Sequence, residues 1–160
     1  MAYPFSLPED SKVVLLNNTA ANAVDCDFIC MKNAHKVWFL IFHAGANDTD
    51  LAIGLTEATD VAAGTSAAVT ATFPAWRDDD AGTTSDTLVK QTDAASFDID
   101  PATENPVLMI LEWDPAKHTA GYDCVAVSDD GAGHGSNTVQ IFAVIAPRYK
   151  QATPPAVITD

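Results

Sequence analysis

Histidines, which can act as general bases or metal ligands, are few and scattered in this sequence. The four are His35, His43, His118 and His134. His35 and His43 flank one apolar segment but lie too far apart along it to bind the same metal ion. The chain also has no glycine-rich phosphate loop, no nucleophile elbow and no helical zinc motif. We therefore expect no catalytic residue and no bound cofactor.

The three cysteines, Cys26, Cys30 and Cys124, are the next candidates for chemistry. On an extended strand, Cys26 and Cys30 would lie on one face but too far apart for a disulfide. Zinc binding would need a fourth ligand and a tighter spacing than this pair has. We therefore expect free thiols that pack as small apolar side chains, and no metal site.

Carboxylates gather in two loop segments, residues 77–80 (RDDD) and 128–135 (SDDGAGHG). Neither segment has the spaced acids and the closing glutamate of a calcium-binding loop, so both are interpreted as solvated loops. Glu112, next to Trp113 in an apolar segment, is the only carboxylate placed like the acid of a glycosidase. Its simpler interpretation is an outward residue at the end of a strand.

The elements that must position these residues are short strands. Runs of β-branched and aromatic residues alternate with clusters of Gly, Asn, Asp, Pro and Thr, which is typical of an all-β protein. The predicted strands are residues 12–17, 25–31, 35–44, 51–55, 67–73, 84–91, 106–113, 122–128 and 137–146. Residues 114–118 predict a single helical turn, with Asp114 as its cap and Pro115 at its first position. Only residues 56–63 show weak helical spacing.

This number and spacing of strands predicts one antiparallel β-sandwich that resembles a jelly roll and spans residues 1–160. Hydrophobic residues make up 48% of the chain, and 22 acidic against 8 basic residues give a formal net charge of -14. Such a surface repels phosphate backbones and anionic lipid headgroups, so neither nucleic acid nor a membrane is expected as a partner.

Two apolar features of the sequence indicate contacts with other proteins. Residues 37–42 and 107–111 are bulky and apolar on both alternating faces, although a sandwich strand has only one face in the core. Their outer face needs a cover, either a loop of the same chain, another copy or a partner. The Pro-rich ends, residues 1–11 and 150–160, predict extended arms, which either dock on a partner or lie along their own domain.

Five stretches of the chain, read together, resemble a known family. They are KNAHKVW at 32–38, EATDVA at 57–62, SDTLVKQTD at 85–93, GYDCVA at 121–126 and RYKQATPP at 148–155. These patterns of ordinary residues are similar to small head proteins of tailed bacteriophages, the capsid decoration or cement proteins. The similarity covers the chain from about residue 12 to its end, and it includes no chemical signature.

The resemblance implies a non-enzymatic protein on the outer surface of the virion capsid, made in the host cytoplasm. Its partner would be the major capsid protein, and it would assemble as a homo-oligomer, a dimer or a trimer. The residues expected to make interface contacts are Tyr3, Phe5, Leu7, Arg148, Tyr149, Pro154 and Pro155. Two alternatives stay open: a tail or fibre component, and a carbohydrate-binding module in which Trp76, Trp113 and Tyr149 stack on sugars.

Overall fold

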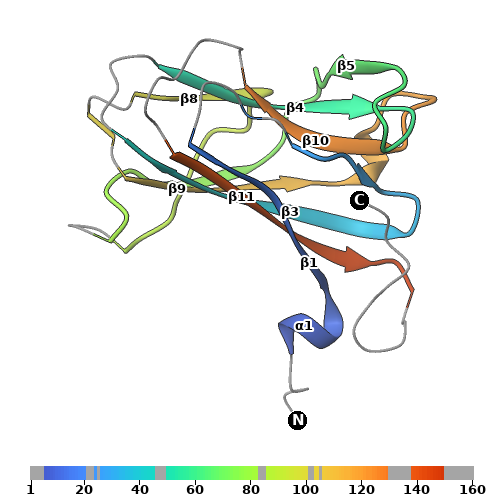
Figure 1. The fold of residues 1–160 in the computed structure, drawn as a ribbon, viewed down its shortest axis with the longest axis horizontal. Coiled ribbons are helices and arrows are strands. Elements are labelled where there is room, and N and C mark those ends of the chain that lie inside the picture. The colour runs from blue at the N-terminus through green and yellow to red at the C-terminus, as the bar shows by residue number, and fades with distance from the viewer. Residues whose placement is uncertain are drawn as a thin grey trace.

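The computed structural model describes residues 6–20, 24, 26–45, 50–82, 86–100, 103–104, 106–129 and 138–149. Over these residues the chain forms two antiparallel β-sheets packed face to face (Figure 1). The predicted all-β sandwich is therefore confirmed. No helix in the described part of the chain is long and apolar enough to cross a membrane.

One sheet has six strands and the other has five. From edge to edge, the six-stranded sheet consists of β1 (Lys12–Ala20), β11 (Thr138–Pro147), β3 (Ala34–Ala44), β9 (Val107–Trp113), β6 (Ala75–Asp78) and β7 (Val89–Lys90). The five-stranded sheet consists of β2 (Ile29–Cys30), β10 (Cys124–Asp129), β4 (Leu51–Ala58) and β5 (Ser66–Ala68), with β8 (Ser96–Ile99) also pairing with β4.

The order of the strands is that of a jelly roll. The first strand pairs with the last, β1 with β11, and the pairs β2–β10, β3–β9 and β4–β8 follow the same nested order. All four pairs are antiparallel, so the chain is one long hairpin rolled into two facing sheets. The strands β5, β6 and β7 are inserted at the tip of this hairpin, between β4 and β8.

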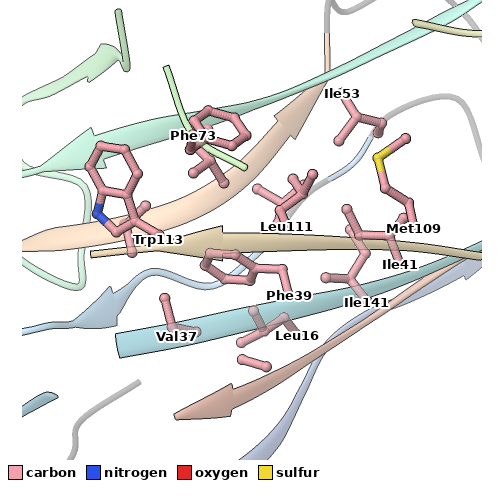
Figure 2. Close-up of a cluster of buried hydrophobic side chains, with 14 of the residues drawn as sticks. Leu16, Val37, Phe39, Ile41, Ile53, Phe73, Met109, Leu111, Trp113 and Ile141 are labelled. Atoms are coloured by element: carbon pink, nitrogen blue, oxygen red, sulfur yellow. The ribbon is translucent and has the colours of Figure 1, made fainter. Parts of the chain in front are cut away.

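Buried and outward-facing residues alternate along the central strands, and the buried ones form the core between the sheets. Every second residue of β3 and β9, beginning with Val37 and Val107, is fully buried. Figure 2 shows several of these side chains, with Phe73 close to Leu111 and Trp113 of β9. The Phe73 ring packs edge-on against Trp113 with 6.0 Å between ring centroids. Each such side chain contributes roughly 1.5–3 kcal/mol by leaving water, which makes this layer the main source of stability.

The short turn after β9 forms as predicted. Residues Pro115–Lys117 make one 3-10 turn (η1), and the Asp114 carboxylate accepts a hydrogen bond from the Ala116 N–H at 2.9 Å. Proline lacks an N–H and has a fixed φ, so it fits the first position of such a turn. The turn places His118 against the end of the core.

Residues 56–63, the one segment with weak helical spacing, are not helical. The strand β4 continues to Ala58, and the chain then turns back into β5. The Asp60 carboxylate accepts hydrogen bonds from the N–H groups of Ala62 and Gly64, which closes the turn. A side chain that bonds its own following backbone favours a turn over a helix.

Several strand predictions differ in extent. The strands β6 and β8 were not expected, because each has only four residues and their sequences, AWRD and SFDI, carry charged residues. The predicted strands 67–73, 84–91 and 25–31 shrink to β5, β7 and β2. With β2 so short, Cys26 lies outside the strand and packs against the core, so the prediction that it shares a face with Cys30 is wrong.

The predicted N-terminal arm is not extended over its described part. Residues Leu7–Asp10 form one helical turn, α1, with Pro8 in its first turn and the Ser6 N–H donating to the Asp10 carboxylate at 2.9 Å. This turn contacts β1 but buries none of its own residues. Residues 1–5 and 150–160, including Tyr3, Phe5, Pro154 and Pro155, lie outside the described residues.

Candidate functional site: an apolar sheet face

The outer face of the six-stranded sheet carries an unbroken row of apolar side chains. The strand register places Leu15 opposite Phe142, Phe142 opposite Leu40, and Leu40 opposite Ile110. Trp76 of β6 lies opposite Ile110 and extends the row to a fifth strand. Because directly opposed side chains on one face contact each other, these residues form a continuous surface across the sheet.

We call this surface the apolar face. It comprises Val13, Leu15, Trp38, Leu40, Phe42, Trp76, Leu108, Ile110 and Phe142. At about 4.8 Å between strands and about 6.8 Å between rows on one face, the patch measures roughly 20 Å by 14 Å, or about 300 Å². Patches of this size on a single chain are often functional.

Solvent reaches the apolar face most easily at its β1 and β11 side. The exposed fractions are 48% for Val13, 49% for Leu15 and 38% for Phe142. Trp38 and Leu40, in the middle of the sheet, are half-buried. The intervening residues of the same strands belong to the core, so the outer side chains point away from the second sheet.

A polar group closes one end of the apolar face. The Glu112 carboxylate accepts a hydrogen bond from Trp38 Nε1 at 2.7 Å and pairs with Lys36 Nζ at 2.7 Å. The structure thus places Glu112 on the outer face at the end of β9, as the sequence indicated. Both carboxylate oxygens are engaged, so Glu112 links the ammonium of Lys36 to the indole of Trp38.

Three of the predicted interface residues lie in the described region. Leu7, on α1, is 41% exposed, and Tyr149, which follows β11, is 67% exposed. Arg148 is also exposed, and its N–H donates to the Asn33 carbonyl at 2.7 Å.

The register brings the two described ends of the chain together. Lys12 lies opposite Ile145, so the start of β1 and the end of β11 meet at one corner of the six-stranded sheet (Figure 1).

A second polar site lies at the end of the sandwich. His118 Nε2 accepts a weak hydrogen bond from Trp113 Nε1, and His118 Nδ1 lies 3.4 Å from the Glu57 carboxylate. The Thr119 N–H donates to the same carboxylate oxygen at 3.0 Å. This arrangement requires the proton on Nδ1, and it engages both ring nitrogens of His118.

The charge of Glu57 is stabilised within this cluster. Burial by itself would raise the pKa of the Glu57 carboxyl, but hydrogen bonds from Thr119 and His118 outweigh it, and the pKa lies below its ordinary value. A cavity of about 210 Å³ beside His118 is lined by Lys32, Tyr122 and Arg148, among others. Because His118 has no free ring nitrogen, we interpret the cluster as a structural brace between β4, β9 and η1.

The remaining sequence candidates lie apart from each other. Trp113 is fully buried, so the expectation that it stacks on a sugar is wrong. In the acidic segment 77–80, Arg77 donates hydrogen bonds to the Asp98 carbonyl and to the Glu104 carboxylate. These bonds tie β6 to the chain around β8. Among the described residues, no three histidine, cysteine or acidic side chains gather as metal ligands. His134 lies outside the described residues.

Comparison with protein-family models, with curated proteins and with solved structures found no match for this chain. The resemblance to bacteriophage head proteins therefore stays a prediction.

The sequence indicated only part of the apolar face. The doubly apolar strands at residues 37–42 and 107–111 indicated it, but nothing in the sequence showed that Leu15, Phe142 and Trp76 complete its row.

Proposed function

We propose that this protein is a structural subunit that binds a larger protein assembly through its apolar face. We further propose that the assembly is a bacteriophage head, whose outer surface the protein decorates as a cement protein. The row from Leu15 to Trp76 is the observation that carries the proposal. In a chain with a net charge of -14, a charge-poor apolar patch of this kind favours a protein partner over solvent.

The size of the patch suits the centre of a protein interface. A stable interface buries about 800 Å² on each partner, with an apolar centre and a polar rim. The apolar face supplies about 300 Å² of such a centre. The half-buried tryptophans Trp38 and Trp76 are of the residue type that most often dominates binding energy.

The fold and the charge agree with a place on the outside of a shell. Jelly rolls are common in viral capsid proteins and in lectins. The acidic remainder of the surface would keep particles apart in solution. A protein that bridges neighbouring capsid subunits in many copies gains collective strength, because each bound copy turns their separation into an intramolecular event. Under this proposal the protein assembles as a dimer or trimer with the major capsid protein as partner.

The proposal is tested by density-gradient fractionation of an infected-cell lysate, with an antibody against this protein. Co-sedimentation with DNA-filled heads in many copies supports the decoration role. Recovery with tails alone favours the tail or fibre alternative. Recovery only among soluble proteins overturns the proposal.

The apolar face can be tested with one matched pair of variants. Phe142→Glu should weaken binding to purified heads at least about tenfold, because a carboxylate would be buried in the interface. Val61→Glu is the control: Val61 is 37% exposed, close to the 38% of Phe142, but lies in the turn after β4. A pulldown that retains Phe142→Glu as well as wild type would exclude this face as the binding surface.

A further inference from the structure

Two of the three cysteines lie directly opposite each other on neighbouring strands. Cys30 of β2 pairs with Cys124 of β10 in the antiparallel register. Their neighbours Ile29 and Val125 both belong to the core, so the two thiols share the opposite, outer face of the five-stranded sheet. Both cysteines are free thiols in this structure.

The hydrogen bonds around this pair place it where side chains of adjacent strands are closest. The Met31 N–H donates to the Asp123 carbonyl at 2.7 Å, which makes Met31 and Asp123 a hydrogen-bonded pair. Hydrogen-bonded and non-hydrogen-bonded pairs alternate along an antiparallel ladder, so Cys30 and Cys124 form a non-hydrogen-bonded pair. The Cα atoms of such pairs are about 4.5 Å apart, within the range of about 4.4–6.8 Å that disulfides span.

The two thiols differ in access to solvent. Cys30 is half-buried, whereas Cys124 is 1% exposed. Burial raises the pKa of the Cys124 thiol to about 12, with further contributions from Cys30 and from the carboxylates of Asp123 and Asp60. Lys32, whose ammonium pairs with Asp123 at 3.0 Å, is the neighbouring positive charge.

We propose that Cys30 and Cys124 form a cross-strand disulfide when the folded protein meets a small-molecule disulfide such as oxidised glutathione. The Cys30 thiolate attacks one sulfur of the reagent and releases one small thiolate. Cys124 then loses its proton and attacks the Cys30 sulfur, which forms the protein disulfide and releases the second thiolate. The two protein thiols are oxidised by two electrons, and the reagent is reduced to two thiols.

The disulfide would stabilise β2, a strand with few other contacts to hold it. The strand β2 has two residues, and among the described residues it pairs only with β10. A short edge strand of this kind opens locally at low cost, and a covalent link to β10 would remove that opening. The protein would thus fold with free thiols in a reducing compartment and close the link after reaching an oxidising one.

The experiment uses the full chain, purified under reduction and then incubated with oxidised glutathione near pH 8. Free thiols are counted by maleimide labelling and mass spectrometry after denaturation. Two of the three thiols should disappear, the intact mass should fall by two hydrogens, and peptide mapping should join Cys30 to Cys124. The oxidised protein should also melt at a higher temperature than the reduced one.

Cys26→Ser is the matched control, since Cys26 packs on the core side and should not compete. This variant should lose both of its thiols, while Cys30→Ser should form no internal crosslink. The closing step should become faster as the pH rises from about 7 to about 9, because Cys124 must first lose its proton. Three labelled thiols in oxidised wild type, or a bond that includes Cys26, would overturn the proposal.

Discussion

Glu57 is a buried carboxylate held by hydrogen bonds from Thr119 and His118. Its pKa is lower in the folded protein than in the unfolded chain, so the folded state favours its charged form. The resulting contribution to stability is complete above the ordinary glutamate pKa of 4.5 and is lost as the pH falls through the lower, folded value. The cluster around His118 should therefore respond to acid.

Replacing Glu57 by glutamine should lower the free energy of unfolding by about 1–2 kcal/mol near neutral pH, because the charged hydrogen bonds are lost. The difference from wild type should shrink at acid pH, once the pH has fallen below the folded pKa of Glu57 and the wild-type carboxyl is protonated too. Urea unfolding at both pH values measures this effect. Glu9→Gln, on the exposed turn α1, is the control and should stay within about 0.5 kcal/mol of wild type. An equal difference at both pH values would contradict this explanation.

Residue types alone indicated part of this chemistry. Asp114 was expected as a cap and Glu112 as an outward residue, and both occupy those positions. The partnership of Glu57 and His118 was not foreseen, since it joins β4 to the end of η1 through tertiary packing. Trp113, which only the carbohydrate-binding alternative placed on the surface, is fully buried, as expected for the neighbour of an outward Glu112 in an alternating strand.

Among the elements, η1 offers a direct test of local structure. Asp114→Ala removes the side-chain cap and should cost about 1 kcal/mol, which lowers the melting temperature by about 2–4 °C in a domain of this size. Asp114→Asn keeps an acceptor for the Ala116 N–H and should melt close to wild type. The melting curves are recorded by circular dichroism. Equal melting temperatures for Asp114→Ala and wild type would show that the cap contributes nothing to stability.

The strands divide into those that the sequence pattern reveals and those that it does not. The strands β3, β9 and β11 are long and apolar, so their positions were predicted closely. The strands β6 and β8 are held by pairing with β9 and β4 and by the contacts of Arg77, and their own four residues are too few for a pattern that stands out in the sequence. Register between distant strands has no local sequence signal, which is why the full apolar row was not foreseen.

At the scale of the whole molecule, we predict that the N-terminal segment contributes to binding. Deletion of residues 1–10 should abolish or strongly weaken binding to heads, because α1 contacts β1, the strand that carries Val13 and Leu15 of the apolar face. The fold should remain, since α1 buries none of its residues. Head pulldown and thermal melting of the truncated chain measure the two effects. Full binding by the truncated protein would exclude a role for the N-terminal arm.

The nested strand order also has a consequence for the timing of synthesis. The strand β11 lies between β1 and β3 in the six-stranded sheet, although it follows all the other described strands along the chain (Figure 1). Until residues 138–147 have been synthesised, β1 lacks the strand with which it pairs among the described residues, and the apolar row lacks Phe142. Such non-local pairing makes folding slow and late. A nascent chain therefore lacks the complete surface proposed for binding, which under that proposal would keep premature copies from occupying places on a growing assembly.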